Sequence, residues 1–265
     1  MLKLGHTIVR LDETASTNSL VLASEPYLDQ HGLVVVARRQ TVGRGRMGRS
    51  WLGVPGEQLF TSIVVHPRLP AADTPAVALI AGLAVAQAIR DTAGLYPRLK
   101  WPNDVLIRGR KVCGILVESS PSRDGAPRLV IGVGVNCQGA PEELPPGLRG
   151  RATALSQEAG RPVPPDALLQ ALLTRLDALL ARLDAGGKTE LLIEWARNAD
   201  AAGRRVLFLS PGSGQAASLR SGQAPVSAAQ TQGIVQGITP EGYLVVEDLA
   251  GLRHVIVSSE LEWRD

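Results

Sequence analysis

Three short apolar runs follow one another in residues 98–118, RLKWPNDVLIRGRKVCGILVE. Each run is bounded by turn residues, so the stretch predicts strands near 98–101, 104–107 and 112–118. Strands joined by tight turns pair in antiparallel fashion, whereas parallel neighbours need a long crossover connection. We therefore expect a sheet that contains hairpins, and not a strict alternation of strands and crossover helices.

The segment before this stretch and the one after it add strands to the sheet. The alternating run HTIVRLD at 6–12 predicts one strand, and the short polar side chains of Ser16-Thr17-Asn18 after it predict a helix start. Apolar runs predict the other strands: 33–37, 59–65 and 128–136.

Two patterns predict the helices that cover the sheet. Thr74-Pro75 opens an apolar helix that stops at Gly94, because Thr caps a helix and Pro suits its first position. Leucines recur at helical spacing after Pro165, and a further helix is expected at 189–199. The expected fold class is therefore α+β, with a mixed central sheet flanked by helices.

The character of the sequence changes after Gly203. Short strands separated by Gly and Pro turns are expected near 204–209, 232–238, 242–247 and 253–257. About sixty residues of this kind predict a small β-barrel, and the stretch 211–230, rich in Ser, Gly and Gln, is expected to be a mobile insertion in it. We therefore expect two domains, 1–202 and 203–265.

The composition limits the class of protein. The chain has 265 residues, 45% of them hydrophobic and 20% charged, which is ordinary for globular domains and excludes disorder throughout. Its net charge of +3 is small for a protein that coats nucleic acid. Cys113 and Cys137 lie in apolar runs without metal-site spacing, so we expect buried free thiols in a reducing cytosol.

We expect a soluble, cytoplasmic protein. The N-terminal residues lack the apolar core of a signal peptide. The longest apolar stretch, 75–89, is too short to cross a bilayer.

Glycines alternate with arginines directly after a predicted strand, in GRGRMGRSW at residues 43–51. Glycine lets the backbone approach a ligand closely, and arginine carries a permanent charge and planar donors that suit phosphate oxygens. The stretch also matches the GxGxxG dinucleotide pattern and RNA-binding arginine–glycine repeats. However, no long helix and no second repeat follow it, and the chain lacks the P-loop pattern. The stretch favours a loop that wraps a nucleotide or an acyl-nucleotide.

A second polar group, KWPND, lies at a strand–turn–strand junction. There Lys100 can meet a phosphate and Asp104 can hold Mg²⁺ or accept a proton, and a plain β-turn with an ion pair fits the same residues. Lys111 opens the next strand, where it can bind a carboxylate or lie solvated at an edge. Gly114 leaves room for a flat ligand. The apolar strand that ends at Asn136 contains Gly132 and Gly134. It is equally consistent with one side of a ligand site and with a strand packed closely against its neighbours.

Five motifs occur in order along the chain: Ser16-Thr17-Asn18, Gln40 followed by GRGRMGRSW, KWPNDV, KVCGILVE with Lys111, and GVGVN ending at Asn136. Together they resemble the biotin–protein ligases, also called biotin–[acetyl-CoA-carboxylase] ligases. The motifs span residues 16–136, and the helices and the β module after them fit the layout of that family. The resemblance therefore extends over essentially the whole chain.

The resemblance implies a fold and a reaction. The fold would be a biotin/lipoate ligase catalytic domain followed by a small C-terminal SH3-like β-barrel. Biotin and MgATP would give biotinyl-5′-AMP and pyrophosphate. Biotin would then pass to a specific lysine of a biotin carboxyl carrier protein, that of acetyl-CoA carboxylase or of a related biotin-dependent carboxylase. ATP and Mg²⁺ are the co-substrate and metal expected, with no tightly bound cofactor.

The resemblance also implies roles for individual residues. The biotin-binding residues would be Ser16, Thr17, Asn18, Gln40, Arg44, Gly45, Arg46, Lys111 and Gly114. The ATP-binding residues would be Arg46, Arg49, Trp51, Lys100, Asn103, Asp104 and Asn136. Arg46, Lys111 and Asp104 would be catalytic, because cations lower the repulsion between the biotin carboxylate and the α-phosphate. Asp104 would hold Mg²⁺ and would orient or deprotonate the acceptor lysine.

Two alternatives stay open. A lipoate or octanoate ligase shares the fold but lacks the GRGRxGR loop in this form. A non-catalytic nucleotide- or RNA-binding protein would need neither Lys111 nor the KWPND turn. Bifunctional members of the family carry an N-terminal DNA-binding domain, which does not fit before Ser16, so we expect no DNA binding. We expect no membrane partner, and the sequence leaves a homodimer open.

Overall fold

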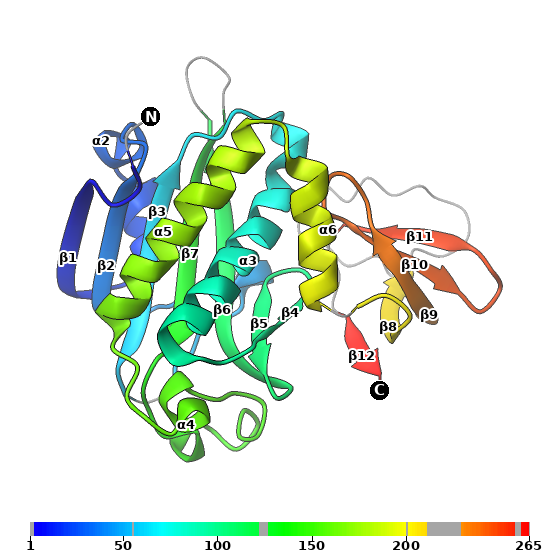
Figure 1. Cartoon of the computed structure of the whole chain (residues 1–265). Coiled ribbons are helices and arrows are strands. Elements are labelled where there is room, and N and C mark those ends of the chain that lie inside the picture. The colour runs from blue at the N-terminus through cyan, green and yellow to red at the C-terminus, as the bar shows by residue number, and fades with distance from the viewer. Residues whose placement is uncertain are drawn as a thin grey trace.

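A sheet of seven strands and a sheet of five strands make up the architecture in Figure 1. The structure is a computed structural model, and it describes residues 3–54, 56–121, 127–199, 201–210, 229–257 and 261–264. The large sheet comes from the first half of the chain, and the small sheet comes from its C-terminal part.

The strands of the large sheet lie in the order β1-β2-β3-β7-β6-β5-β4. Their bounds are β1 Thr7–Thr14, β2 Leu33–Gln40, β3 Gln58–Val65, β4 Arg98–Lys100, β5 Asp104–Ile107, β6 Arg110–Ser120 and β7 Arg128–Asn136. Strands β1 and β2 pair in parallel, and the other neighbours pair antiparallel. The predicted mixed sheet and its β4–β5–β6 hairpins are confirmed.

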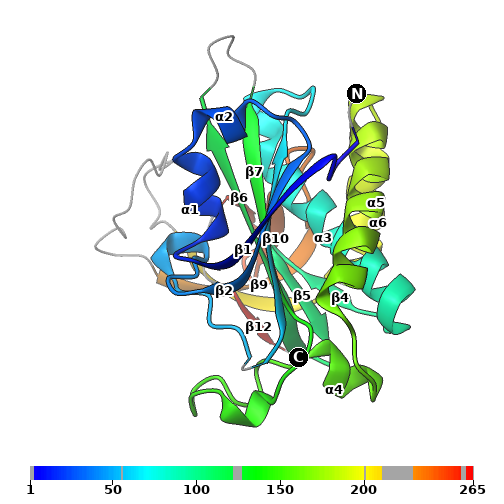
Figure 2. The same cartoon turned by 90° about the vertical axis from the view of Figure 1, so that its left-hand side faces the viewer.

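Helices cover both faces of this sheet. Their bounds are α1 Thr17–Leu22, α2 Glu25–Leu28, α3 Thr74–Ala93, α4 Leu155–Ala159, α5 Pro165–Asp184 and α6 Lys188–Ala199. In Figure 2, α3, α5 and α6 lie on one side of the sheet, and α1 and α2 lie on the other. The predicted helix ends are confirmed: the Ser16 side chain accepts from the Ser19 N–H, and Gly94 ends α3 with a φ of 70°.

Strand β2 is buried on both of its faces. Val34 packs in the large core with residues of α3 and α5. Leu33 and Val35 pack on the opposite face with Leu28 of α2. Successive side chains of a strand point to opposite faces, so a strand that is covered on both sides forms a continuous apolar run.

Helix α3 with its preceding turn, Ala71–Ala93, is long and apolar enough by length and composition to cross a membrane, which the sequence analysis did not expect. Within the fold it is a core helix, because 67% of its most apolar window is buried inside the protein. It packs against the sheet and against α5 and α6. Burial in the protein accounts for its composition.

The C-terminal strands form an antiparallel sheet in the order β11-β10-β9-β8-β12. Their bounds are β8 Arg205–Ser210, β9 Ala229–Ile238, β10 Leu244–Asp248, β11 Arg253–Ile256 and β12 Glu262–Arg264. The predicted small β module is confirmed, but the closed barrel is not: in the described residues the outer strands β11 and β12 do not pair. A barrel needs hydrogen bonds between those two edges, and β12 offers three residues.

The predicted insertion 211–230 lies largely outside the described residues, which resume at 229. Ala229 and Gln230 pair with Ser210 and Leu209 in the β8–β9 ladder. These two positions are therefore part of a strand. Three elements of only four, five and three residues, α2, α4 and β12, were not predicted, because they are too short to show a periodicity.

The two sheets share one hydrophobic core. Val206 and Phe208 of β8 belong to the same buried cluster as the residues of α3. Trp101 Nε1–H donates to the Gly242 carbonyl oxygen over 3.0 Å. A methyl group at Gly242 would press on Leu79 of α3 at 3.1 Å. The turn between β9 and β10 therefore rests against α3 and against the turn that joins β4 to β5.

Three histidines meet where β1 begins and β3 ends. The His66 N–H donates to His31 Nδ1 over 3.0 Å, and His6 Nε2 lies 2.9 Å from the His31 carbonyl oxygen. Burial lowers the pKa of His31 from 6.5, and the neighbouring His66 lowers this pKa further. Asp184 and Asp177 oppose the shift. An imidazole that accepts through Nδ1 is unprotonated at that atom, so folding favours the neutral ring.

Lowering the pH should destabilise the protein through His31. The unfolded chain takes up the proton at a higher pH than the folded chain, so stability that is present above about pH 6.5 is lost as the pH falls below it. We expect the free energy of unfolding in urea to decrease between about pH 7.5 and about pH 5.5. The His31→Asn side chain keeps a hydrogen-bond acceptor but cannot titrate. The free energy of unfolding of this variant should therefore decrease less over the same pH range. Equal losses in the two proteins would contradict this account.

Candidate active site

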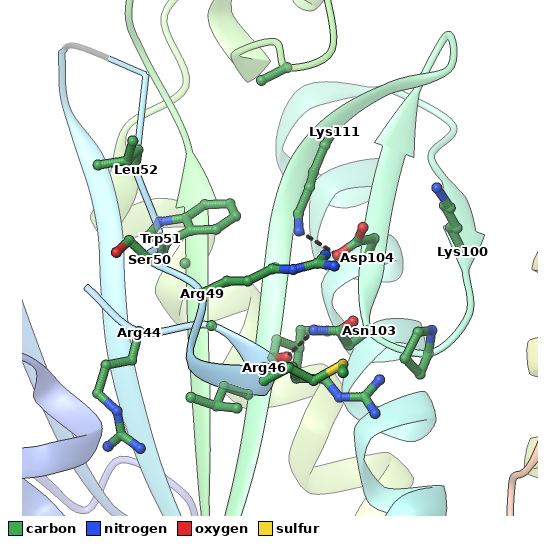
Figure 3. A pocket seen from close by; sticks show the side chains of 18 of the residues that line it. Arg44, Arg46, Arg49, Ser50, Trp51, Leu52, Lys100, Asn103, Asp104 and Lys111 are labelled. Atoms are coloured by element: carbon green, nitrogen blue, oxygen red, sulfur yellow. Dashed lines mark hydrogen bonds and ion pairs between the residues drawn. The ribbon is translucent and has the colours of Figure 1, made fainter. Parts of the chain in front are cut away.

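A cleft of about 1060 Å³ opens between the large sheet, the arginine-rich loop and the C-terminal sheet. It is lined by all the residues that the sequence analysis assigned to the site: Ser16, Thr17, Asn18, Gln40, Arg44, Gly45, Arg46, Arg49, Trp51, Lys100, Asn103, Asp104, Lys111, Gly114 and Asn136. Figure 3 shows the charged part of this cleft. Motifs that are up to 120 positions apart in the chain therefore face one cavity.

Polar side chains at one end of the cleft come from the start of α1 and the end of β2. The Thr17 N–H donates to Gln40 Oε1 over 2.7 Å, which leaves the Gln40 amide nitrogen as a donor. Ser62 Oγ lies 2.7 Å from Thr17 Oγ1 and 2.5 Å from Asn18 Oδ1. This end of the cleft therefore offers hydrogen-bonding groups in fixed orientations.

The arginine-rich loop, residues 43–51, folds back on itself. The Gly45 N–H donates to the Arg49 carbonyl oxygen over 2.7 Å, and the Trp51 N–H donates to that of Gly43 over 2.9 Å. Met47 at the tip has a φ of 55°, as a tight turn requires. A methyl group at Gly43 would collide with the Trp51 carbonyl oxygen, so glycine is needed there.

The indole of Trp51 packs onto two neighbouring strands. Methyl groups at Gly114 of β6 and at Gly134 of β7 would each collide with its ring. The sequence analysis expected a ligand over Gly114, and the structure places the Trp51 ring there. Lys111 Nζ lies 5.2 Å from the centre of that ring. The indole N–H is buried against the backbone at Gly134 and has no hydrogen-bond partner among the described residues.

Lys111 and Asp104 form the charged centre of the cleft, where Lys111 Nζ lies 2.5 Å from Asp104 Oδ1. Asp104 is the one carboxylate among the described residues that line the cleft. Burial lowers the pKa of Lys100 and the pKa of Arg46, and Asp104 opposes both shifts. Arg49 extends toward the ion pair in Figure 3. The excess of cations over carboxylates suits an anionic ligand.

Asn103 and Asn136 are both held by backbone groups. Asn103 Nδ2 donates to the Ile115 carbonyl oxygen over 2.7 Å (Figure 3). The buried Asn136 accepts from the Val54 N–H over 3.2 Å and donates to the Thr153 carbonyl oxygen over 3.0 Å. The sequence analysis assigned both amides to a nucleotide. In the structure Asn136 fastens two loops to the end of β7, so its amide already has partners on both sides.

The described residues contain no group of three or more His, Cys, Asp and Glu side chains placed to hold a metal ion. Asp104 and the Asn103 side-chain oxygen are the neighbouring oxygen donors of the KWPND turn. This donor set suits a hard cation that obtains its remaining ligands from a substrate.

Three residues in or beside the cleft were not predicted: Ser62, Glu118 and Arg151. A buried hydroxyl within the apolar run of β3 was a usable signal for Ser62. Glu118 closes the KVCGILVE motif and pairs with a cleft arginine. Arg151 lines the cleft, and its carbonyl oxygen accepts from the Lys111 N–H over 2.8 Å. Burial lowers the pKa of Lys100, and the charge of Arg151 lowers it further. Arg151 lies outside the sequence motifs, so no local pattern pointed to it.

Comparison with known families gives two matches. Residues 11–136 match the Biotin/lipoate A/B protein ligase family, and residues 225–262 match the Biotin protein ligase C terminal domain. The chain is 31% identical to the bifunctional ligase/repressor BirA of Bacillus subtilis, over 98% of this chain and 74% of that protein. It is 33% identical to the biotin--[acetyl-CoA-carboxylase] ligase of Paracoccus denitrificans, over 95% of this chain and 98% of that protein.

A solved structure supports the same relationship. The biotin protein ligase from Aquifex aeolicus in complex with biotin and ATP superposes with a TM-score of 0.77 at 26% identity. The match covers 98% of this chain and 99% of that chain, so it includes both sheets.

Replacing Asn136 by alanine should destabilise the fold. The change leaves the buried Val54 N–H and Thr153 carbonyl without partners, so we expect a loss of about 1–3 kcal/mol in the free energy of unfolding. Urea unfolding measures this. Gln138→Ala is the matched control, because its amide bonds Glu57 at the surface and its loss should cost less than about 0.5 kcal/mol. Equal costs would show that the Asn136 contacts do not support the fold.

Proposed function

This chain belongs to the biotin protein ligases, and from that premise we propose that its cleft attaches biotin to a carrier protein at the expense of ATP. Biotin and ATP give biotinyl-5′-AMP and pyrophosphate, and biotin then passes to a lysine of the biotin carboxyl carrier protein of acetyl-CoA carboxylase. The observation that carries the proposal is the Lys111–Asp104 ion pair, which shares one cleft with the arginine-rich loop and the polar end.

The polar end fits the head group of biotin. A ureido ring is flat, with two N–H donors and one carbonyl acceptor, and it needs fixed partners in an otherwise apolar slot. Asn18 Oδ1 is an acceptor and the Gln40 amide nitrogen is a donor there, and Ser16 and Thr17 add hydroxyl groups. We assign these four residues to the biotin ring.

The first step brings anions together. A biotin carboxylate oxygen attacks the α-phosphorus of ATP, the bond from that phosphorus to the bridging oxygen breaks, and pyrophosphate leaves with the electron pair. Lys111, Arg46 and Arg49 reduce the repulsion between the carboxylate and the phosphates and stabilise the charge that spreads in the transition state. Arg46 is partly buried, so its charge acts where water screens it less.

The residues of the KWPND turn fit Mg²⁺ brought by ATP. This ion prefers oxygen ligands and usually takes only one or two carboxylates from a protein. Asp104 supplies a carboxylate, and Asn103 donates through its nitrogen to Ile115 and so keeps its side-chain oxygen. When bound, Mg²⁺ neutralises charge on the phosphates. We assign Lys100, Asn103, Asp104 and Trp51 to the nucleotide side of the cleft.

In the second step the amine of the carrier lysine attacks the acyl carbonyl carbon, and AMP leaves with its oxygen. The amine must lose a proton before or during attack, and Asp104 is the carboxylate of the cleft that can accept or orient it. Lys111, which lies 2.5 Å from Asp104, can meet the acyl carbonyl oxygen at the same time. No side chain has to act as a covalent nucleophile.

We further propose that residues 1–202 are the catalytic domain and that residues 203–265 are an SH3-like module. The five antiparallel C-terminal strands and the match to the C-terminal domain family support that module. Cys113 and Cys137 are free thiols, as is usual in a reducing compartment, which supports a cytoplasmic location.

Biotin should support exchange of labelled pyrophosphate into ATP, because the first step is reversible, and lipoate and octanoate should not. Lys111→Met keeps the apolar stem of the side chain but removes its charge. It should lower the exchange rate about 100- to 1000-fold, the usual cost of losing one transition-state donor. Lys3→Met, an exposed lysine outside the cleft, is the control. Exchange with lipoate or octanoate in place of biotin would overturn the substrate assignment, and an unaffected Lys111→Met would overturn the role of Lys111.

The Asp104→Asn substitution should impair transfer. It preserves the shape of the side chain but removes the proton acceptor, so transfer from preformed biotinyl-5′-AMP to the carrier should slow by about 100-fold or more. Asp12→Asn on β1, whose carboxylate is exposed, is the control. The rate is measured by single-turnover labelling of the carrier. Normal transfer by Asp104→Asn would rule out Asp104 as the base.

A further inference from the structure

Glu118 touches two cleft residues from outside the cleft. It lies near the end of β6, its side chain is 21% exposed, and it is not among the described residues that line the cavity. One carboxylate oxygen, Oε1, accepts from Arg44 Nη2 over 2.6 Å. The other, Oε2, accepts from Asn18 Nδ2 over 2.9 Å. A single carboxylate therefore connects the arginine-rich loop to the start of α1.

Arg44 is held at both ends of its guanidinium. Its Nη2 bonds Glu118 and its Nη1 donates to Ser19 Oγ over 3.0 Å. In Figure 3 its side chain points away from Lys111 and Asp104, unlike that of Arg49. The resemblance implied biotin binding for Arg44. Its charge is instead matched by Glu118, so Arg44 is an anchor of the loop.

Asn18 is held in one amide orientation. Both of its amide hydrogens have acceptors, Glu118 Oε2 and the Leu116 carbonyl oxygen at 3.1 Å. Its Oδ1 accepts from Ser62 Oγ, and a methyl group at Gly132 would collide with it. Reversing the amide would set its oxygen against the Glu118 carboxylate, which is repulsive. Asn18 therefore offers the cleft only an acceptor, and a ligand group beside it must donate.

We propose that Glu118 is a positioning residue that latches the arginine-rich loop through Arg44 and fixes Asn18 as an acceptor for a ureido N–H of biotin. The inference rests on the proposed function of the cleft. Glu118 does not reach the reacting atoms, so it governs biotin affinity and retention of the acyl-adenylate and leaves the rate of chemistry at saturation unaffected. The pair is charge-assisted, with Arg44 42% exposed and Glu118 21% exposed, and the second bond from Arg44 to Ser19 adds to its strength.

The test uses the full chain and biotin-dependent pyrophosphate exchange. The Glu118→Gln substitution keeps the shape of the side chain but replaces one carboxylate oxygen by an NH₂ group. That group is a donor and would face an N–H donor of Arg44 or of Asn18, so one of the two hydrogen bonds is lost. The KM for biotin should rise about 10- to 100-fold, as for loss of a charged hydrogen bond, while kcat changes less than about threefold. Asp166→Asn removes the 2.7 Å partner of Arg10, an arginine–carboxylate pair outside the cleft, and should leave both constants unchanged.

A second measurement separates latching from general stability. Biotinyl-5′-AMP released to solution per carrier labelled should rise in Glu118→Gln, and equally in Arg44→Gln, which lies on an accessible loop. The double variant should be no worse than the worse single variant, because both break one pair. If Glu118→Gln had the wild-type KM for biotin and released no more biotinyl-5′-AMP than the wild type, the proposed role of Glu118 would be wrong. Fully additive effects of the two substitutions in the double variant would also contradict it. Absence of exchange in the wild type would instead overturn the proposed function.

Discussion

The cleft depends on how β5 pairs with β6. Asp104 faces Gly114 across the two strands, and an irregularity between Val105 and Leu106 sets Leu106 opposite Lys111. That register brings the Lys111 ammonium to the Asp104 carboxylate at the base of the cleft. A slip by one residue would turn a side chain to the other face of the sheet and would leave a partly buried charge without its partner.

Glycines on β6 and β7 shape the neighbouring wall of the cleft. Gly132 and Gly134 are two residues apart on β7 and so face the same side. Asn18 covers the first and Trp51 covers the second, together with Gly114 of β6. Because these glycines have no side chains, Asn18 and the Trp51 ring pack directly on the backbone of the strands. The two ends of the cleft differ because a polar amide, that of Asn18, lies over Gly132, whereas an aromatic ring, that of Trp51, lies over Gly134 and Gly114.

The sequence was sufficient for the long elements, and every residue that it assigned to the site lines the cleft. Helices α3 and α5, and every strand of the large sheet, leave a periodicity or an apolar run that can be read locally. Hydrogen-bond partners cannot be read in this way. Arg44 and Glu118 are 74 positions apart, and Asn136 and Val54 are 82 positions apart, so their pairing follows only from the strand order. The closed barrel is not confirmed in the described residues, where β12 has three residues with which to pair.

The bond from Trp101 to Gly242 and the common core of the two sheets have a consequence for cooperativity. Separate modules joined by a linker can unfold one at a time, but here β8 contributes Val206 and Phe208 to the cluster that also holds α3. Opening the C-terminal strands would expose that cluster and release the turn that carries Asn103 and Asp104. We therefore expect the two sheets to unfold as one cooperative unit. A substitution that loosens the C-terminal strands should also reduce the order of the turn that carries Asn103 and Asp104.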